Sequence, residues 1–181
     1  IVGNQLDTTC NSVVNAYSID CSPQVTSIDG IQYFDNLHNL QCEGTQVSYI
    51  NSLPPRLRKL YCKENQLTGI AYLPDSLEFL DCSDNLLTSL PVLPGTLKTL
   101  DCSLNQLTAL SVIPAGLESL IYMYNQISIF PNLPNTLRVL YCAGNGILNI
   151  PALPDSLRTF YCGVNNLTSI PALPMFLEEF Y

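Results

Sequence analysis

The chain has 181 residues, of which 47% are hydrophobic and 12% are charged, and its formal net charge is −8. Because so apolar a chain can bury a substantial core, its composition excludes global disorder. The negative charge repels phosphate backbones and anionic lipids, and no apolar run approaches the roughly 20 residues of a membrane-spanning helix. We therefore expect neither nucleic-acid binding nor insertion into a membrane.

In chain order, the sequence divides into four parts. Residues 1–18 match no repeat and are predicted to form an N-terminal cap, because an end repeat must cover an open core. Residues 19–56 hold two degenerate turns, and residues 57–176 hold six regular turns of twenty residues with the pattern LxxLxCxxNxLTxLPxLPxx. Residues 177–181 begin one more turn, which is truncated. A fixed period of this length predicts a solenoid.

Within each regular turn, LxxLxC alternates buried and exposed positions, which predicts a short strand with one buried face. Copies of this strand should stack in parallel about 4.8 Å apart. The rest of the turn contains two prolines, so we expect extended or polyproline segments with little α-helix. A tight turn is expected after Pro74, Pro94 and their equivalents. The predicted fold is a mostly β repeat solenoid of the α/β type.

An asparagine follows each predicted strand, three residues after the cysteine position. We expect these amides to hydrogen-bond backbone groups of adjacent turns, which a tight buried bend leaves unpaired. A ligand-binding role for the amides is the alternative. The six residues are Asn65, Asn85, Asn105, Asn125, Asn145 and Asn165.

These motifs resemble those of leucine-rich repeat proteins over residues 19–181. The twenty-residue length and the LPxLP motif look like the bacterial subclass found in secreted YopM and IpaH effectors, although valine or leucine is usual there at the cysteine position. The cysteine column is similar to that of internalin J and related bacterial surface proteins. The resemblance implies a right-handed superhelix with a parallel sheet on its concave face, and a recognition role. This sequence shows no ligase domain after the repeats, so the resemblance does not imply the ligase activity of the IpaH type.

The regularly spaced cysteines are interpreted as a buried column of free thiols, since thiols pack like small hydrophobic groups. Redox control, disulfides and soft-metal binding are alternatives, but parallel side chains do not converge on one metal ion. Cys10 lies off the column, and a disulfide with Cys21 is a second possibility for that pair. Tyr122 replaces one cysteine, so either the core adapts around the ring or the strand is distorted and the ring leaves the core.

The outward side chains of the strands form the candidate partner-binding surface. Tyr141 and Tyr161 should lie on consecutive turns, and Ala143 and Gly163 should leave a shallow depression beside them. Exposed aromatic clusters mark interaction sites, although aromatic rows also stabilise sheet surfaces. The candidate residues are Tyr61, Phe79, Asp81, Asp101, Ile121, Met123, Val139, Tyr141 and Tyr161.

The sequence offers no set of residues for catalysis. Asp81 and Asp101 are neighbours in one column, but no third carboxylate or histidine accompanies them, so a solvated acidic patch is favoured over an acid–base pair or a cation site. His38 is the single histidine and has no evident nucleophile beside it. We expect no enzyme activity, no cofactor and no metal.

The sequence therefore predicts a non-catalytic recognition module of a secreted or surface-exposed bacterial protein, which binds a protein, peptide or glycan on its concave face. One alternative is the substrate-recognition arm of a secreted effector enzyme. Another is a structural subunit of a surface assembly. We expect the natural chain to continue beyond Tyr181, where Leu177 and Phe180 would be exposed at an open end that frays or joins a larger assembly.

Overall fold

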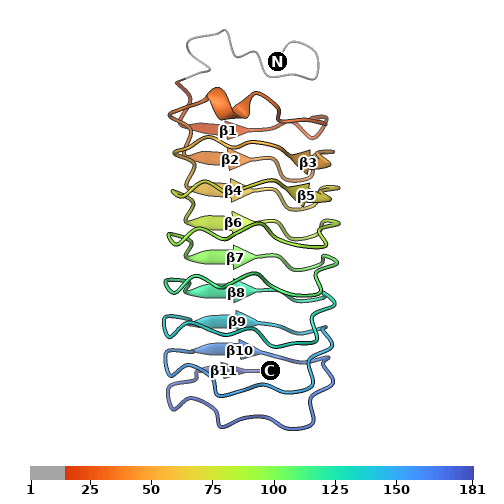
Figure 1. The fold of residues 1–181 in the computed structure, drawn as a ribbon, viewed down its shortest axis with the longest axis vertical. Coiled ribbons are helices and arrows are strands. Elements are labelled where there is room, and N and C mark those ends of the chain that lie inside the picture. Colours follow the sequence, from red (N-terminus) through yellow and green to blue (C-terminus); the bar gives the residue numbers. More distant parts are fainter. Residues whose placement is uncertain (1–14) are drawn as a thin grey trace.

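A parallel sheet of nine short strands runs the length of the molecule, with one strand from each turn (Figure 1). The computed structural model describes residues 15–181. In spatial order the strands are β1 (Ser18–Asp20), β2 (Asn39–Gln41), β4 (Lys59–Tyr61), β6 (Phe79–Asp81), β7 (Thr99–Asp101), β8 (Ser119–Ile121), β9 (Val139–Tyr141), β10 (Thr159–Tyr161) and β11 (Glu179–Phe180).

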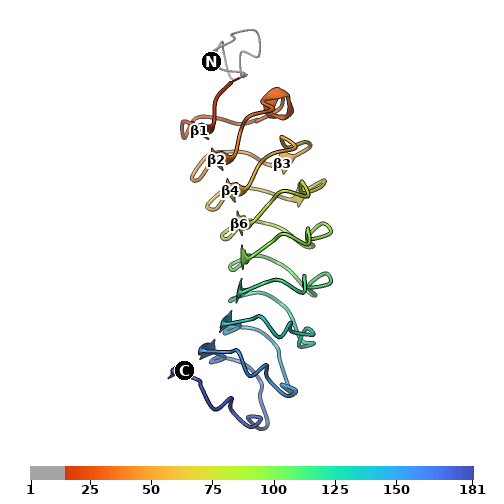
Figure 2. The same ribbon diagram turned by 90° about the vertical axis from the view of Figure 1, so that its left-hand side faces the viewer.

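The register of the sheet equals the sequence period in the regular turns. Leu80 pairs with Leu100, and Leu100 with Leu120, so residues twenty apart lie one above another. The middle residue of each of these three-residue strands is buried and its two neighbours are half-buried. Seen from the side, the row of strands lies on the concave face of a gently curved solenoid (Figure 2). The predicted parallel-strand solenoid is confirmed.

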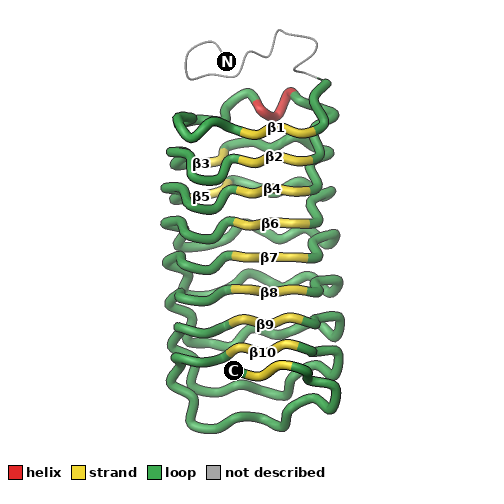
Figure 3. Tube along the Cα trace, turned by 180° about the vertical axis from the view of Figure 1, so that it is seen from behind, coloured by secondary structure: helices red, strands yellow, loops and turns green. Residues whose placement is uncertain are grey.

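The opposite side of the solenoid is almost entirely loop and turn (Figure 3). It carries the 3-10 helix η1 (Ile31–Tyr33) and a two-stranded parallel sheet of β3 (Tyr49–Ile50) and β5 (Gly69–Ile70). Glycine at position 69 leaves room for Tyr49, because a Cβ atom there would lie 2.6 Å from Cε2 of that ring. The Leu77 amide donates to the Pro74 carbonyl at 3.0 Å, which closes the turn predicted after this proline.

The core is a stack of apolar columns between the two sides. The residues at the first and fourth positions of each regular turn are fully buried, and all of them are leucines except Phe160. Further along the turn, Leu67, Leu87 and Leu107 are fully buried as well. The cysteines complete the stack as predicted: Cys82 and Cys102 are both buried and lie on adjacent turns. Burying this apolar surface is the main driving force for stacking the turns.

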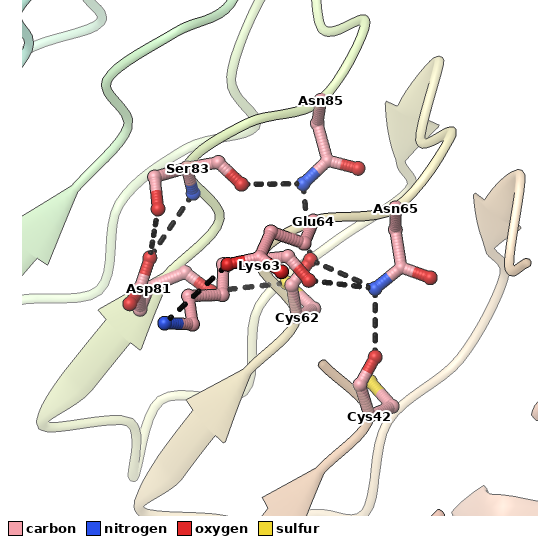
Figure 4. Close-up of polar contacts among 8 residues, drawn as sticks. All are labelled: Cys42, Cys62, Lys63, Glu64, Asn65, Asp81, Ser83 and Asn85. Carbon is pink, nitrogen blue, oxygen red and sulfur yellow. Dashed lines mark hydrogen bonds and ion pairs between the residues drawn. The ribbon is translucent and has the colours of Figure 1, made fainter. Parts of the chain in front are cut away.

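The asparagines form a hydrogen-bonded ladder beside the core (Figure 4). The Asn85 side-chain amide donates to the carbonyls of Cys62, Cys82 and Ser83 at 3.0, 3.1 and 3.0 Å, and its Oδ1 accepts from the Leu67 amide at 2.9 Å. One side chain thus satisfies backbone groups of two turns. The pattern recurs from Asn65 to Asn165. The structural interpretation of these amides is confirmed.

Candidate binding surface on the concave face

The nine predicted partner-binding residues all lie on the strands of the concave face or, for Met123, two residues after β8. Every one of the nine is half-buried, so each presents part of its side chain to solvent. The sheet register places residues 61, 81, 101, 121, 141 and 161 in one row, as the sequence predicted.

The aromatic residues fall into two separate clusters on this face. Near the N-terminal end, the rings of Tyr61 and Phe79 have centroids 4.6 Å apart. Near the C-terminal end, the ring centroid of Tyr161 lies 6.0 Å from that of Tyr141 and 5.8 Å from that of Tyr181, with an interplanar angle of 78° in both pairs. These edge-to-face contacts are the favourable geometry for rings whose faces are negative and edges positive. The rings therefore present faces and edges alternately.

Asp81 and Asp101 lie side by side between the two clusters. Ser83 Oγ donates to Asp81 Oδ1 at 2.7 Å, and the Ser83 and Ser103 amides donate to Oδ1 of Asp81 and Asp101 at 3.1 and 3.0 Å (Figure 4 shows Asp81 and Ser83). Partial burial raises the pKa of Asp101, against the opposing effect of its hydrogen bonds from Ser103. Hydrogen bonds thus hold the two carboxylates in place on the concave side of the sheet.

The outward face of β8, β9 and β10 is uncharged, whereas β11 carries the exposed Glu179. From Ser119 to Gly163, the outward positions of the strands and the positions just after them hold only apolar, tyrosine, serine, threonine or glycine side chains. Arg138 and Arg158 lie next to this area, one residue before β9 and β10. Ala143 is fully buried, so its part in the depression predicted beside the rings is wrong, whereas Gly163, the other residue of that prediction, is half-buried.

Two exposed apolar residues next to this area escaped the sequence analysis. Leu104 and Tyr124, both 50% exposed, occupy the position after the outward column, where the backbone has a φ of 55° and 53°. Tyr124 lies against Gly144 of the next turn, where a Cβ atom would come within 2.4 Å of its Cδ1. The signal in the sequence was the pairing of a large residue at 124 with glycine twenty residues later.

The described cysteines are all free; six of them are buried and Cys21 is half-buried. Desolvation raises the pKa of Cys142 to about 12 and that of Cys21 to about 11, and it raises the pKa of Cys62 and Cys102 further above the ordinary value. Because the thiolate is the nucleophile and the metal ligand, these thiols are poor candidates for either role at neutral pH. Cys10, and with it the suggested Cys10–Cys21 disulfide, lies outside the described residues.

The cysteine column also links adjacent turns by hydrogen bonds. Four thiols each donate to a backbone carbonyl of the next turn, that of the residue just before the cysteine position. With S···O distances of 3.4 to 3.6 Å, the pairs are Cys42 to Tyr61, Cys62 to Asp81, Cys82 to Asp101 and Cys102 to Ile121. S–H donors are weak, so these contacts orient the thiols more than they stabilise the fold.

Tyr122 stays in the cysteine column. Its side chain is fully buried, and β8 pairs in regular register with both neighbouring strands. The interpretation that the core adapts is therefore correct, and the alternative in which the ring leaves the core is wrong. Its hydroxyl interacts electrostatically with the Cys142 thiol, but no atom satisfies it in hydrogen-bonding geometry.

The remaining candidate groups have local structural contacts. The His38 ring stacks on Tyr17 with centroids 4.4 Å apart, and its Nδ1 lies 2.8 Å from the Asn36 carbonyl oxygen.

Within residues 15–181, no three potential ligands among histidine, cysteine, aspartate and glutamate come together as a metal site. The same part of the chain contains no helix long and apolar enough to cross a membrane.

Comparisons with known proteins support the fold. No protein-family model matches the chain, and no curated protein matches it. Among solved structures, YopM from Yersinia enterocolitica WA-314 is 32% identical with a TM-score of 0.70, and YopM from Yersinia pestis, a leucine-rich effector protein, is 29% identical with a TM-score of 0.87; each match covers 92% of this chain. The functional domain of InlJ from Listeria monocytogenes, which includes a cysteine ladder, is 25% identical over 88% of this chain, with a TM-score of 0.52.

These likenesses confirm the resemblance predicted from the repeat and from the cysteine column. The chain covers 44% and 48% of the two YopM structures and 47% of the InlJ domain, so it spans a little less than half the length of each.

Proposed function

Because the chain is a leucine-rich repeat protein of the bacterial 20-residue type, we propose that it is a non-catalytic recognition module of a secreted or surface-exposed bacterial protein. Solenoids of this class offer a long, regular face that suits binding, and the similar structures include a leucine-rich effector protein and the functional domain of InlJ, both from bacteria. The partner would be a protein, a peptide or a glycan bound on the concave sheet.

One observation carries this proposal: over β8, β9 and β10 the concave face combines an aromatic cluster with a continuous uncharged surface. Tyr141 and Tyr161 contact each other there, beside Ile121, Met123 and Val139. Tyrosine supplies a large contact area at a low cost in conformational entropy and is enriched at binding hot spots. An uncharged area of this kind on an otherwise acidic chain supports a partner-binding role.

The test is the paired substitution Tyr141→Ala and Tyr161→Ala in the immobilised protein, assayed for capture of partners from host-cell and bacterial-envelope extracts. We expect at least a tenfold loss of the specifically captured material, since truncation of hot-spot residues costs about 2 kcal/mol or more each. Tyr72→Ala is the matched control, because Tyr72 is a half-exposed tyrosine on the opposite side of the solenoid.

Circular dichroism and thermal unfolding must show that the double variant keeps the fold. If the folded double variant captures the same material as the wild-type protein, the concave aromatic cluster is not the binding surface. Equal losses for the double variant and for Tyr72→Ala would likewise contradict the assignment of this face.

A further inference from the structure

We propose that the partner is an extended protein segment that lies along the concave sheet, with a lysine or arginine side chain between Asp81 and Asp101, one apolar side chain on Ile121 and a second between Tyr141 and Tyr161. This inference rests on the proposed function and adds the chemistry and the spacing of the partner. Its basis is the division of the concave face into an acidic part and an uncharged part.

The acidic part lacks a fixed counter-charge. Asp81 and Asp101 are directly paired across β6 and β7, and like charges in that position repel each other. None of the ion pairs among residues 15–181 includes either carboxylate. Lys63 has a small electrostatic effect on Asp101, but its ammonium group forms an ion pair with Glu64, with Nζ 3.7 Å from Oε1, and with neither aspartate. A cation from a partner, placed between the two carboxylates, would therefore remove a repulsion.

The half-buried setting of the two carboxylates strengthens this effect. Charges near a protein surface interact several times more strongly than charges in bulk water, because the local dielectric constant is lower. Partial burial also raises the pKa of Asp101, and the neighbouring charge of Asp81 acts in the same direction, which reflects the cost of holding this charge beside a second carboxylate. A bound ammonium or guanidinium group would offset that cost and form charge-assisted hydrogen bonds with the free carboxylate oxygens.

The uncharged part begins in the next turn. Ile121 follows Asp101 in the same outward row, and Tyr141 and Tyr161 continue the row. The tyrosine rings meet at 78°, so they form no flat platform for stacked sugars and instead leave notches between a face and an edge. Such notches suit the side chains of a protein segment.

The spacing of the two parts sets the register of the partner. Strands lie about 4.8 Å apart, so Ile121 is about 7 Å, and the midpoint of the two tyrosines about 14 Å, from the midpoint of the aspartates. Same-face side chains of an extended chain recur about every 7 Å. The matching motif is a basic residue followed at the second and fourth positions by large apolar residues, in either chain direction.

The test uses two defined peptides as probes: eleven residues with a central Lys-Thr-Val-Thr-Phe, and the same peptide with glutamate in place of lysine, each also made in reverse order. Fluorescence anisotropy at low salt measures their binding to the wild-type protein. We compare it with binding to a charge-swapped variant, Asp81→Lys with Asp101→Lys. The control is Asp75→Lys with Asp155→Lys, which changes the net charge equally at two exposed positions outside the concave sheet.

We expect the wild-type protein and the control to prefer a lysine peptide at least tenfold, and the charge-swapped variant to prefer the corresponding glutamate peptide. A preference that is the same in all three proteins, or no binding of either peptide, overturns the inference. A different outcome is that the double variant Tyr141→Ala with Tyr161→Ala abolishes capture from extracts while the charge swap leaves the peptide preference unchanged. In that case the proposed function stands and only the partner chemistry is wrong. If the wild-type protein binds a glycan and neither peptide, the proposed function likewise stands and the proposed partner chemistry is wrong.

Discussion

At the scale of single residues, Tyr122 shows how much the core tolerates. A phenol occupies a position that holds a thiol in the neighbouring turns, yet the ring is fully buried and the strand is regular. Cysteine is small, so the thiols of Cys102 and Cys142 on either side leave room for the ring. The hydroxyl group lies against the Cys142 thiol, and burial together with this interaction raises the pKa of Tyr122, but no atom of the described residues meets the hydroxyl in good hydrogen-bonding geometry.

This predicts that Tyr122→Phe stabilises the protein. Leaving a buried hydroxyl unsatisfied costs about 1–3 kcal/mol, and phenylalanine removes the group while keeping the ring. We expect the free energy of unfolding in urea to rise by about 1 kcal/mol. Tyr122→Ala, which also removes the ring, should lower it by about 3–5 kcal/mol through the cavity it leaves. A loss of stability in Tyr122→Phe would show that the hydroxyl has a partner, such as the Cys142 thiol.

A second feature at this scale is the left-handed backbone just before each asparagine. Glu64, Asp84, Leu104, Tyr124 and Val164 all have φ between 52° and 56°, and Gly44 and Gly144 take the same place in their turns. This conformation is unfavourable for residues with a Cβ atom and most of all for a β-branched residue such as valine. The asparagine hydrogen bonds and the packing of adjacent turns hold the bend in place.

At the scale of elements, two ladders of polar side chains join each turn to the next. The asparagine ladder lies at one end of the strands. A second ladder, which the sequence analysis missed, uses the hydroxyl that ends most of the regular turns. Ser76 Oγ lies 2.8 Å from the carbonyl oxygens of both Pro55 and Leu57, and Thr96 Oγ1 lies 2.7 and 2.8 Å from those of Asp75 and Leu77, so each single hydroxyl proton is shared between two acceptors of the preceding turn. Thr136 Oγ1 has the two equivalent acceptors in its preceding turn, and Ser156 Oγ donates to the Leu137 carbonyl alone, at 2.6 Å.

Gly116 interrupts the hydroxyl ladder, so Gly116→Ser should restore it. The new Cβ would meet only the flexible Lys98 ammonium at 3.3 Å and the Gly95 carbonyl oxygen at 3.7 Å, which the hydroxyl could then use as an acceptor. We expect a gain of about 1–2 kcal/mol in thermal or urea unfolding, from one hydrogen bond and the loss of glycine freedom in the unfolded chain. Gly116→Ala is the matched control and should gain only the second part. Equal stability of the two variants would contradict the ladder interpretation.

At the scale of the whole molecule, stacking the turns places a line of protonated thiols inside the solenoid. Burial disfavours the thiolate, so the pKa of these groups is raised above 9.0 in the folded state, to about 12 for Cys142. Below pH 9 both the folded and the unfolded states keep their protons, and the stability from burial is fully present. Above pH 9 the unfolded thiols ionise first, which favours unfolding.

We therefore predict that the free energy of unfolding falls as the pH rises from 9 to about 11. Each buried thiol contributes a slope of up to about 1.4 kcal/mol per pH unit in this range. Urea titrations at several pH values measure the slope in the wild-type protein and in Cys82→Ala, which lacks one buried thiol. The variant should show a slope smaller by about one thiol, whatever its absolute stability. An unchanged slope would mean that the buried thiols do not control alkaline unfolding.

Much of the architecture could be predicted from the residues themselves, because the fold repeats a single unit. Leu80, Leu100 and Leu120 had to lie one above another once the period was twenty, and that placed Asp81, Asp101 and Ile121 in one outward row. The asparagine ladder followed from the need to satisfy backbone groups at a bend. These inferences depend only on spacing and on local chemistry.

The amino-acid sequence by itself determined the solenoid, its register and which side chains face inward, because periodicity alone decides these. Only the tertiary structure decided that Ala143 is covered, that Tyr122 stays buried without a well-placed hydrogen-bond partner among the described residues, that Tyr124 rests on Gly144, and how the rings of Tyr141 and Tyr161 meet. The physical reason is that these features depend on the shapes of unlike side chains in neighbouring turns, which a repeat pattern does not contain.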